Sequence, residues 1–416
     1  MSFDLRKSAL WYHNKPSPGK ISISATKSTE TQDDLALCYT PGVAEPVKEI
    51  AADPSNAYRY TSKGNLVGII TNGTAVLGLG HVGALASKPV MEGKAVLFKR
   101  FADIDAFDIE INCDDPHDFI ETVKRIAPTF GAINLEDIKA PECFIIEKTL
   151  SEQLDIPVLH DDQHGTAIVI AAGLLNGLEL QNKNLSDVTI VCAGAGSAGI
   201  AAMRLLKKLG ADSNRILMID RAGVIHADRK DLNEYKKEFA VQTSKRTLEE
   251  AVAAADIFIG VSGPGILTPD MLASMNAKPI VFALSNPTPE IMPDVARKVR
   301  TDLILATGRS DYPNQVNNAL CFPYLFRGAL DVHATCINQA MQLAAVYAIK
   351  NLAHEPLTKQ VMQAYGLTQK LQFGPDYILP MMLDARLKET VSDAVKAAAI
   401  ESGVARQFNV EIPGEN

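Results

Sequence analysis

Residues 188–199 read Val188-Thr-Ile-Val-Cys-Ala-Gly194-Ala-Gly196-Ser-Ala-Gly199, and this stretch is the strongest indication of the fold class. A β-branched apolar run leads into a G-x-G-x-x-G motif, and an Ala- and Leu-rich helical stretch follows. Glycines at these places let the backbone approach a pyrophosphate, which the unpaired N–H groups of the helix N-terminus bind. Asp220 ends the next apolar run, at about the 20-residue spacing expected of a ribose-binding acid. The stretch therefore predicts a dinucleotide-binding strand, turn and helix.

Strands and helices alternate on both sides of this unit. After it, we expect helices over 197–209, 247–255 and 269–275 and strands over 215–220, 257–261, 280–284 and 303–307. Before it, helical stretches over 115–127 and 141–153 alternate with short apolar runs over 66–70, 95–98, 106–111, 131–135 and 156–159. Such alternation predicts an α/β protein with a doubly wound parallel sheet.

The chain is predicted to have two domains, because 416 residues are too many for one compact core. We expect an N-terminal α/β domain over 1–163 and a Rossmann-like domain over 164–416, which begins with an apolar helix over 166–178. From about 319 the chain is expected to be helical to its end, and these C-terminal helices are expected to fold back on the N-terminal domain.

Composition excludes several classes of protein. An apolar content of 47% with 22% charged residues is that of a globular protein. A net charge of -8 without long like-charge runs argues against nucleic acid or an anionic membrane as partner. The N-terminus has no apolar signal segment, and the longest apolar run, 167–175, is too short to span a bilayer. We therefore expect a cytoplasmic protein with a small-molecule substrate.

Two pairs of acidic residues precede the glycine motif. Glu136-Asp137 and Asp161-Asp162 each follow a short apolar run, so each is expected where a strand meets a loop. Adjacent carboxylates repel one another unless a cation joins them, and hard ions such as Mg²⁺ or Mn²⁺ take oxygen ligands. Helix capping is the alternative. Because capping explains only one acid per helix, we favour a metal site.

Two further motifs have a structural explanation as an alternative to a functional one. Gly78-Leu-Gly80-His-Val-Gly83 also matches G-x-G-x-x-G, but residues 87–89 make the following stretch a poor long helix. A tight packing turn is the favoured interpretation. His160 and His164 have the i, i+4 spacing of zinc ligands. However, the residues between them differ from a zinc protease motif and the run is expected to precede the helix, so zinc is discounted.

Seven motifs occur in a recognisable order: Tyr39-Thr-Pro-Gly, Gly93-Lys94-Ala95, Asn134-Leu-Glu136-Asp137, His160-Asp-Asp162-Gln-His-Gly165-Thr166, the Gly194 motif, Ser285-Asn286-Pro287 and Asn317-Asn318. Over nearly its whole length the chain resembles malic enzymes. It is most similar to the short bacterial type, including the malic part of hybrids that carry a phosphotransacetylase-like domain.

The resemblance implies metal-dependent oxidative decarboxylation of L-malate to pyruvate and CO2, with reduction of NAD⁺ or NADP⁺. It makes the N-terminal domain the site for substrate and metal. Lys94 matches the base for the 2-hydroxyl, Tyr39 the acid that protonates enolpyruvate, and Asp161 a partner of Lys94. The ligands of Mg²⁺ or Mn²⁺ are matched by Glu136, Asp137 and Asp162. Because a lysine with a pKa of ~10.4 is protonated at neutral pH, Lys94 needs burial or a nearby cation to act as a base.

The resemblance also assigns cofactor and substrate contacts. The cofactor residues are Gly194, Gly196, Ser197, Ala198, Gly199, Asp220, Arg221 and Asn286, and the substrate residues are Asn286 and Asn318. Asp220 favours NAD⁺ by repelling a 2′-phosphate, whereas Arg221 would accommodate that of NADP⁺; we slightly favour NAD⁺. Without the resemblance, Tyr39 and the two asparagines would be read as turn residues and Lys94 as a surface lysine.

One position departs from the family pattern. Larger malic enzymes have an arginine for a malate carboxylate where this chain has Ala75. The distal carboxylate is therefore expected to use Asn318 or the turn near Gly78.

Other functions stay open at this point: a malolactic reaction giving lactate, a plain 2-hydroxy acid dehydrogenase giving oxaloacetate, and a non-catalytic nucleotide-sensing protein on the same fold. The family suggests a homodimer or a higher homo-oligomer.

Overall fold

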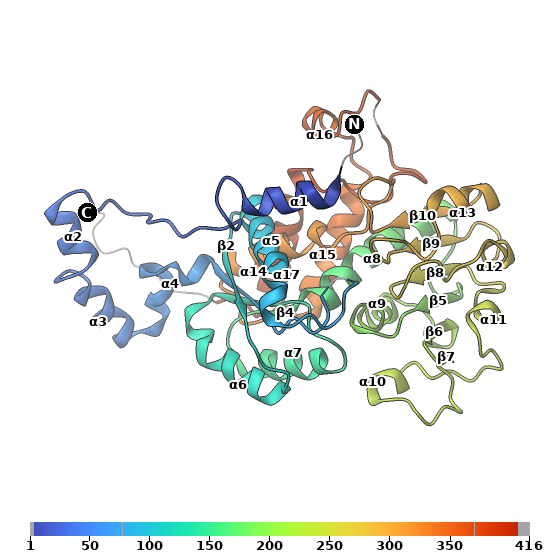
Figure 1. The fold of residues 1–416 in the computed structure, drawn as a ribbon, viewed down its shortest axis with the longest axis horizontal. Helices are drawn as coiled ribbons and strands as arrows, with labels where there is room; N and C mark the ends of the chain where they lie inside the picture. Colours follow the sequence, from blue (N-terminus) through green and yellow to red (C-terminus); the bar gives the residue numbers. More distant parts are fainter. Residues whose placement is uncertain (1–3, 77, 370, 407–416) are drawn as a thin grey trace.

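The computed structural model of the protein describes residues 4–76, 78–369 and 371–406. Two β-sheets lie one beyond the other along the long axis of the molecule (Figure 1). Each sheet is built from strands that alternate with helices, so the predicted α/β class is confirmed.

The first sheet is entirely parallel and has the strand order β2-β1-β3-β4. Its strands are β1 (Leu66–Thr71), β2 (Asp105–Glu110), β3 (Ala132–Leu135) and β4 (Val158–His160). The connecting helices are α5 (Ala84–Ala102), α6 (Pro116–Ile126) and α7 (Glu142–Gln153). Strands β1, β3 and β4 are buried along their whole length, as parallel strands covered on both faces should be.

Two local predictions were wrong. The apolar run 95–98, expected as a strand, lies in α5, and Pro89 is inside this 19-residue helix. Buried residues of α5 recur at helical spacing (Met91, Lys94, Ala95, Phe98 and Ala102), so packing of this face outweighs the poor local helix propensity.

The helix expected over 166–178 is α8 (Asp161–Gln181), which begins directly after β4. Acidic residues in a first helical turn are stabilised by the helix dipole, and Asp161 and Asp162 occupy that turn. The run from His160 to His164 therefore enters the helix and does not precede it.

The second sheet has the order β10-β9-β8-β5-β6-β7 and is parallel except for β7. Its strands are β5 (Ile190–Ala193), β6 (Ile216–Asp220), β7 (Gly223–Val224), β8 (Ile257–Gly260), β9 (Ile280–Ala283) and β10 (Ile304–Thr307). Its helices are α9 (Ser197–Lys208), α10 (Glu234–Lys237), α11 (Leu248–Val252), α12 (Pro269–Ser274) and α13 (Pro293–Val299). The chain leaves β5 toward β6 on one side and later adds β8 on the other. This reversal of strand order is where doubly wound sheets bind ligands.

The C-terminal helices join the two sheets. They are α14 (Phe322–Asp331), α15 (Gln339–Leu352), α16 (Lys359–Ala364) and α17 (Arg386–Glu401). α15 and α17 pack together, α15 also packs on α8, and α14 packs on α5, where the ring of Phe98 lies 4.8 Å from that of Phe322. The domain boundary at 163/164 stays a prediction, since α8 runs across it.

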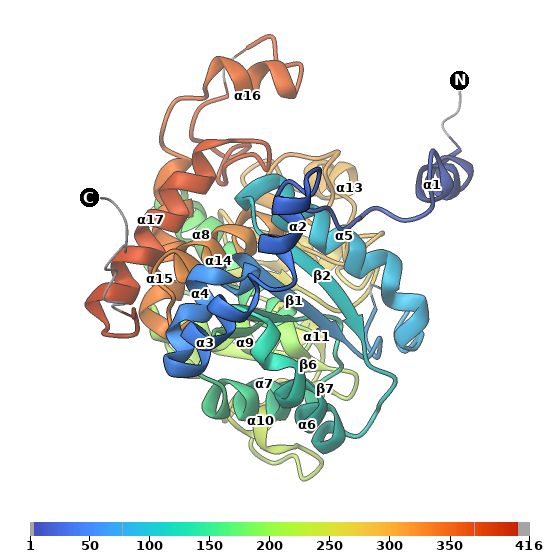
Figure 2. The same ribbon diagram turned by 90° about the vertical axis from the view of Figure 1, so that its left-hand side faces the viewer.

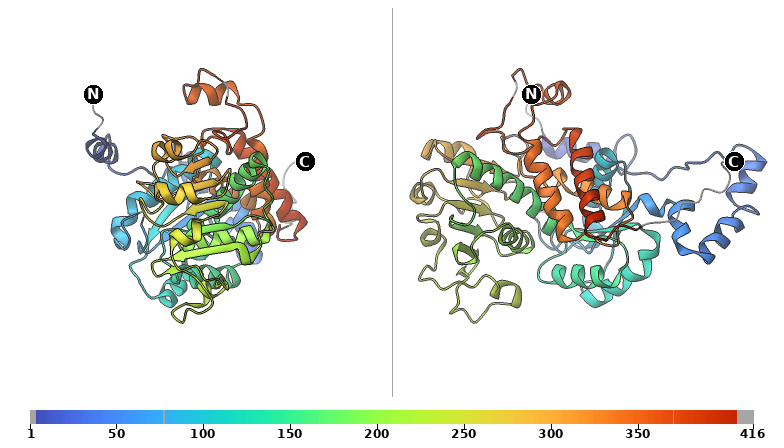
Figure 3. Two further views of the ribbon diagram at one scale, coloured as in Figure 1. Left: turned by 90° about the vertical axis from the view of Figure 1, so that its right-hand side faces the viewer. Right: turned by 180° about the vertical axis from the view of Figure 1, so that it is seen from behind.

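The N-terminal segment forms an arm, defined here as residues 4–60. It carries α1 (Leu5–Asn14), α2 (Gln32–Cys38), α3 (Ala44–Ala52) and α4 (Ala57–Tyr60), and these four helices contain no buried residue. α2 and α3 project beyond the first sheet (Figures 1 and 3), and α1 stands away from the body in the view of Figure 2. None of the described helices combines the length and apolar composition needed to cross a bilayer.

Candidate active site

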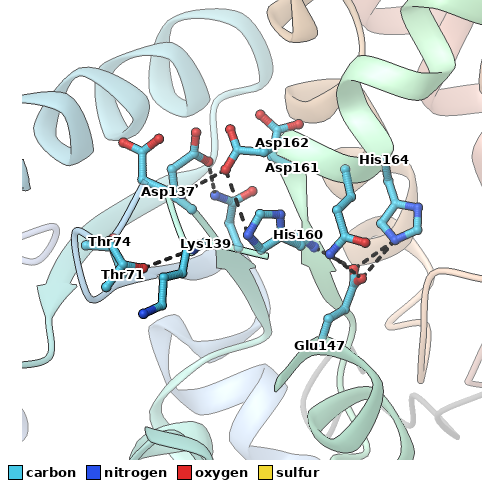
Figure 4. Close-up of polar contacts among 12 residues, drawn as sticks. Thr71, Thr74, Asp137, Lys139, Glu147, His160, Asp161, Asp162 and His164 are labelled. Atoms are coloured by element: carbon cyan, nitrogen blue, oxygen red, sulfur yellow. Dashed lines mark hydrogen bonds and ion pairs between the residues drawn. The ribbon is translucent and has the colours of Figure 1, made fainter. Parts of the chain in front are cut away.

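The two acidic pairs follow neighbouring strands of the first sheet. Glu136 and Asp137 come after β3, and Asp161 and Asp162 begin α8 after β4. Glu136, Asp137 and Asp162 each offer an oxygen, and these oxygens lie within 4.8 Å of one another. The backbone N–H of Asp137 donates to Asp162 Oδ2 at 2.8 Å (Figure 4). The structure thus brings the three predicted metal ligands together.

The charges of this group fit a divalent cation. Burial, together with the charge of Asp161, raises the pKa of Asp162 to about 6, although Lys94 opposes the shift. Burial also raises the pKa of Glu136, and Asp162 adds to this shift. Carboxylates that are crowded and partly desolvated are stabilised by a hard cation, and an all-oxygen set suits Mg²⁺ or Mn²⁺.

Lys94 lies beside this group, on the buried face of α5. Its Nζ is 2.7 Å from Asp161 Oδ2 and 2.8 Å from Glu136 Oε1, and 4.3 Å from the centre of the Phe322 ring. Burial alone would lower the pKa of Lys94, but the charges of Asp161 and Glu136 outweigh it and raise the pKa above its usual value. Lys94 is therefore not a surface lysine, and it stays an ammonium while both carboxylates are ionised.

Asp161 connects Lys94 to the C-terminal part of the chain. Its Oδ2 accepts from Lys94 and from Asn318 Nδ2, which is 2.6 Å away. Burial raises its pKa to about 6 against the opposing charge of Lys94. A Cβ on Gly165 would lie 1.9 Å from Asp161 Oδ1, so glycine is required there. Asn318, expected to contact malate, is placed against Asp161.

Tyr39 is not near these residues within the chain. It follows α2 in the arm and is 73% exposed. Figures 1 and 3 show α2 well separated from β4 and α5. One chain alone does not bring the expected acid and base together.

The glycines of the first motif have distinct positions. A Cβ on Gly194, whose φ is 121°, would lie 2.6 Å from the carbonyl oxygen of Val261. A Cβ on Gly199 would lie 1.9 Å from that of Gly194. Gly196 has open space around its Cβ position, and Ser197 and Ala198 begin α9. Two glycines thus allow close packing, while the third leaves the approach to the helix N-terminus open, as a pyrophosphate requires.

Asp220 ends β6 but is already bound by cations. It accepts from Arg229 at 2.8 and 3.1 Å, from Lys236 at 2.6 Å and from the backbone of Ala222 at 3.0 Å. Arg221 is exposed. Sequence reasoning missed Arg229 and Lys236, because only the fold brings Arg229, in the loop after β7, and Lys236, on α10, to the end of β6.

The loop after β1 approaches both halves of the site. The backbone N–H of Ala75 donates to the carbonyl of Asp137 at 2.9 Å. A Cβ on Gly78 would lie 3.1 Å from the backbone oxygen of Asn286, which is exposed beyond the end of β9. Gly80 and Gly83 have φ values of 75° and 85°, and the N–H of Val76 donates to the carbonyl of Gly80 at 3.0 Å, so this part of the second glycine motif forms a turn. A Cβ on Gly80 or Gly83 would meet no atom within 4 Å, so close packing is not the reason for these two glycines.

Comparisons with known proteins agree over both halves of the chain. Residues 18–151 match the family model of the malic enzyme N-terminal domain, and 163–365 match that of the malic enzyme NAD binding domain.

Individual relatives are similar to this chain over nearly its whole length. An NADP-dependent malic enzyme of Halomonas elongata is 60% identical over 97% of this chain and 95% of its own length. One of Escherichia coli is 57% identical over 97% of this chain, which spans only 54% of that relative. The crystal structure of malic enzyme from Pyrococcus horikoshii superposes with a TM-score of 0.87 at 44% identity, covering 97% of this chain and 92% of that one.

Proposed function

The chain belongs to the malic enzyme family, and we propose that it oxidatively decarboxylates L-malate to pyruvate and CO2 while reducing NAD(P)⁺. The observation that carries this proposal is the cluster of Lys94, Asp161 and three ligand-type carboxylates, reached by the same loop that approaches Asn286 of the dinucleotide domain.

The chemistry divides between a cation and the side chains. Glu136, Asp137 and Asp162 would hold Mg²⁺ or Mn²⁺, which supplies a Lewis acid for the 2-oxygen of the substrate and for the enolate left by CO2. Glu136 is also one of the three carboxylates, with Asp161 and Asp162, that raise the pKa of Lys94. If Glu136 binds this cation, Asp161 is the remaining carboxylate in contact with the Lys94 ammonium.

With Glu136 and Asp162 binding a cation, the carboxylates would raise the pKa of Lys94 less, so its ammonium would release its proton more readily. The neutral amine would then accept the proton of the 2-hydroxyl as hydride leaves C2 for the nicotinamide. Asp161 keeps Nζ of Lys94 in place, and Asn318 in turn orients Asp161. After CO2 departs, C3 of enolpyruvate needs a proton, and Tyr39 matches the family's acid for this step.

Product analysis tests this function. The purified chain is incubated with L-malate, Mn²⁺ and either NADP⁺ or NAD⁺, and reduced cofactor, pyruvate, lactate and oxaloacetate are measured. Equal amounts of pyruvate and reduced cofactor are expected. Lactate without net reduction would instead establish the malolactic reaction, oxaloacetate a plain dehydrogenase, and no turnover a silent relative.

We propose NADP⁺ as the preferred cofactor, against the slight preference for NAD⁺ drawn from the sequence. The acceptor oxygens of Asp220 are engaged by Arg229 and Lys236, so its charge is neutralised where a ribose hydroxyl would need it. The same cations, with exposed Arg221, suit a 2′-phosphate. The two curated relatives described above are also NADP-dependent.

Replacing Lys236 with alanine is expected to raise the KM for NADP⁺ by about tenfold, because a charge-assisted contact to the phosphate is lost. The KM for NAD⁺ should stay nearly constant. Steady-state kinetics with both cofactors measure this, and Lys237→Ala, on the same short helix, is the matched control. Equal changes for the two cofactors would contradict the assignment.

We infer that the active form is a homodimer or a higher homo-oligomer in which the arm carries Tyr39 to the Lys94 site of another copy. The arm helices bury no side chain within their own chain, and apolar residues on them face outward: Leu35, Leu37, Val43 and Val47. Such a surface needs a partner. Because Tyr39 is also remote from its own Lys94, a second copy accounts for both observations.

Mixed dimers test this arrangement. Tyr39→Phe and Lys94→Ala homodimers are each expected to be inactive. A heterodimer of the two, isolated with two affinity tags, would have one intact site if Tyr39 acts across the interface, and should regain about half of wild-type activity. Tyr12→Phe, another exposed tyrosine of the arm, should stay active. An inactive heterodimer with normal assembly would show that both residues serve their own chain.

A further inference from the structure

The Glu147 carboxylate, on α7, contacts three residues that have no role in the chemistry proposed above: His160, Gln163 and His164. Its Oε1 accepts from the backbone N–H of His160 at 2.7 Å, and its Oε2 accepts from Gln163 Nε2 at 3.0 Å. His164 Nε2 lies 3.0 Å from the same carboxylate (Figure 4). The Glu147 side chain is only 12% exposed, so this charge is placed inside the protein for these contacts.

These contacts bracket the functional residues in sequence and in space. Asp161 and Asp162 lie between His160, whose backbone N–H binds Glu147, and Gln163, whose side chain binds it. The first turn of α8 has no side-chain cap of its own, because His160 stands at the N-cap without such a bond. Uncapped helix ends fray unless other groups satisfy their N–H donors. Glu147 provides an anchor of this kind from a neighbouring helix.

The arrangement also explains the two histidines without zinc. The His164 ring binds Glu147 and is turned away from Asp137 and Asp162, two of the candidate metal ligands (Figure 4). The His160 ring is fully buried, with its Nε2 3.8 Å from Asp162 Oδ2. The backbone N–H of His160 and the ring of His164 thus bind the same carboxylate, and the two rings do not face a shared ion.

We propose that Glu147 is a positioning residue that sets the metal-binding geometry of Asp162 and the contact of Asp161 with Lys94. This rests on the proposed function, since Asp162 is taken as a metal ligand. Glu147 itself touches no candidate ligand, so its action passes through the backbone of the β4–α8 junction. Groups that orient ligands in this way typically contribute roughly 10- to 100-fold to metal affinity.

The test is the substitution Glu147→Gln, which keeps the volume and the acceptor for His160 but places an NH2 group against the donors of Gln163 and His164. Mn²⁺ binding is measured directly, by electron paramagnetic resonance of the free ion, without malate or cofactor. We expect a Kd about tenfold higher than in the wild-type enzyme. In kinetics, the Mn²⁺ concentration that gives half-maximal activity should rise while the KM for NADP⁺ stays constant. Loss of folded enzyme would instead lower the apparent kcat and leave both concentrations unchanged.

Further variants test the donor–acceptor pairing, provide a control and replace Glu147→Gln if that variant does not fold. The double variant Glu147→Gln with Gln163→Glu exchanges acceptor and donor, and it is expected to recover most of the lost Mn²⁺ affinity. Glu152→Gln, an exposed position on the same helix, should leave the affinity unchanged. If Glu147→Gln does not fold, Gln163→Met removes one contact only and should raise the Kd by a smaller factor.

Each outcome has a distinct meaning. An unchanged Kd in folded Glu147→Gln, or an equal loss in Glu152→Gln, would overturn the positioning role. Failure of the double variant to recover would do the same for the proposed donor–acceptor pairing. If the wild-type chain does not bind Mn²⁺, the proposed function itself would be contradicted, because it requires a divalent cation at Glu136, Asp137 and Asp162.

Discussion

Lys94→Ala is expected to lower kcat for malate oxidation by at least about 1,000-fold, within the range that a general base contributes. The variant removes the nitrogen that contacts both Asp161 and Glu136. Both carboxylates have raised pKa values, so they can take up protons once the ammonium is gone, and the fold should survive.

Reduced-cofactor production under single-turnover conditions measures this effect, with circular dichroism as the check on folding. Lys99→Ala is the matched control, since Lys99 lies on the same helix in exposed ion pairs with Asp103 and Asp105. Exposed pairs contribute about 1 kcal/mol or less, so this control should remain active. A Lys94→Ala rate within tenfold of wild type would remove Lys94 from the reaction.

Asp162→Ala is expected to abolish turnover together with its dependence on Mn²⁺. Asp162 supplies one of three oxygens within 4.8 Å of one another and also accepts from the backbone of Asp137, so its loss removes a ligand and loosens a second one. We expect direct Mn²⁺ binding to weaken by about 100-fold or more.

Direct binding separates this prediction from the preceding one, because Lys94→Ala should still bind Mn²⁺. Asp118→Asn, an exposed acid on α6, serves as the control. Normal Mn²⁺ affinity in Asp162→Ala would move the metal away from the junction of β3, β4 and α8.

Local patterns were sufficient for much of the site. The Gly194 motif and the two acidic pairs were identified because strand ends, glycines and adjacent carboxylates carry their meaning within a few residues. α5 was misread because its apolar run is short and Pro89 lowers its local propensity, whereas the burial of its face against α14 is a contact between distant segments. The start of α8 was placed too late for a related reason: its anchor, Glu147, belongs to a different helix.

The amino-acid sequence alone was enough to predict the doubly wound architecture, the dinucleotide motif and the residue types of the candidate metal and base sites. These depend on periodicity and on short-range chemistry. Only the tertiary structure decided the state of each group. The pKa of Lys94 is raised because Asp161, 67 positions away, reaches its nitrogen, and Asn318 binds that same Asp161 across 157 positions.

Asp220 is likewise neutralised by Arg229 and Lys236 from the segment after β7, which includes α10, and Tyr39 is held on an arm away from its own Lys94. The physical reason is common to all of these residues. A pKa, a hydrogen-bond partner or a shared site depends on charges and burial within a few ångströms, and those neighbours are set by how remote segments pack.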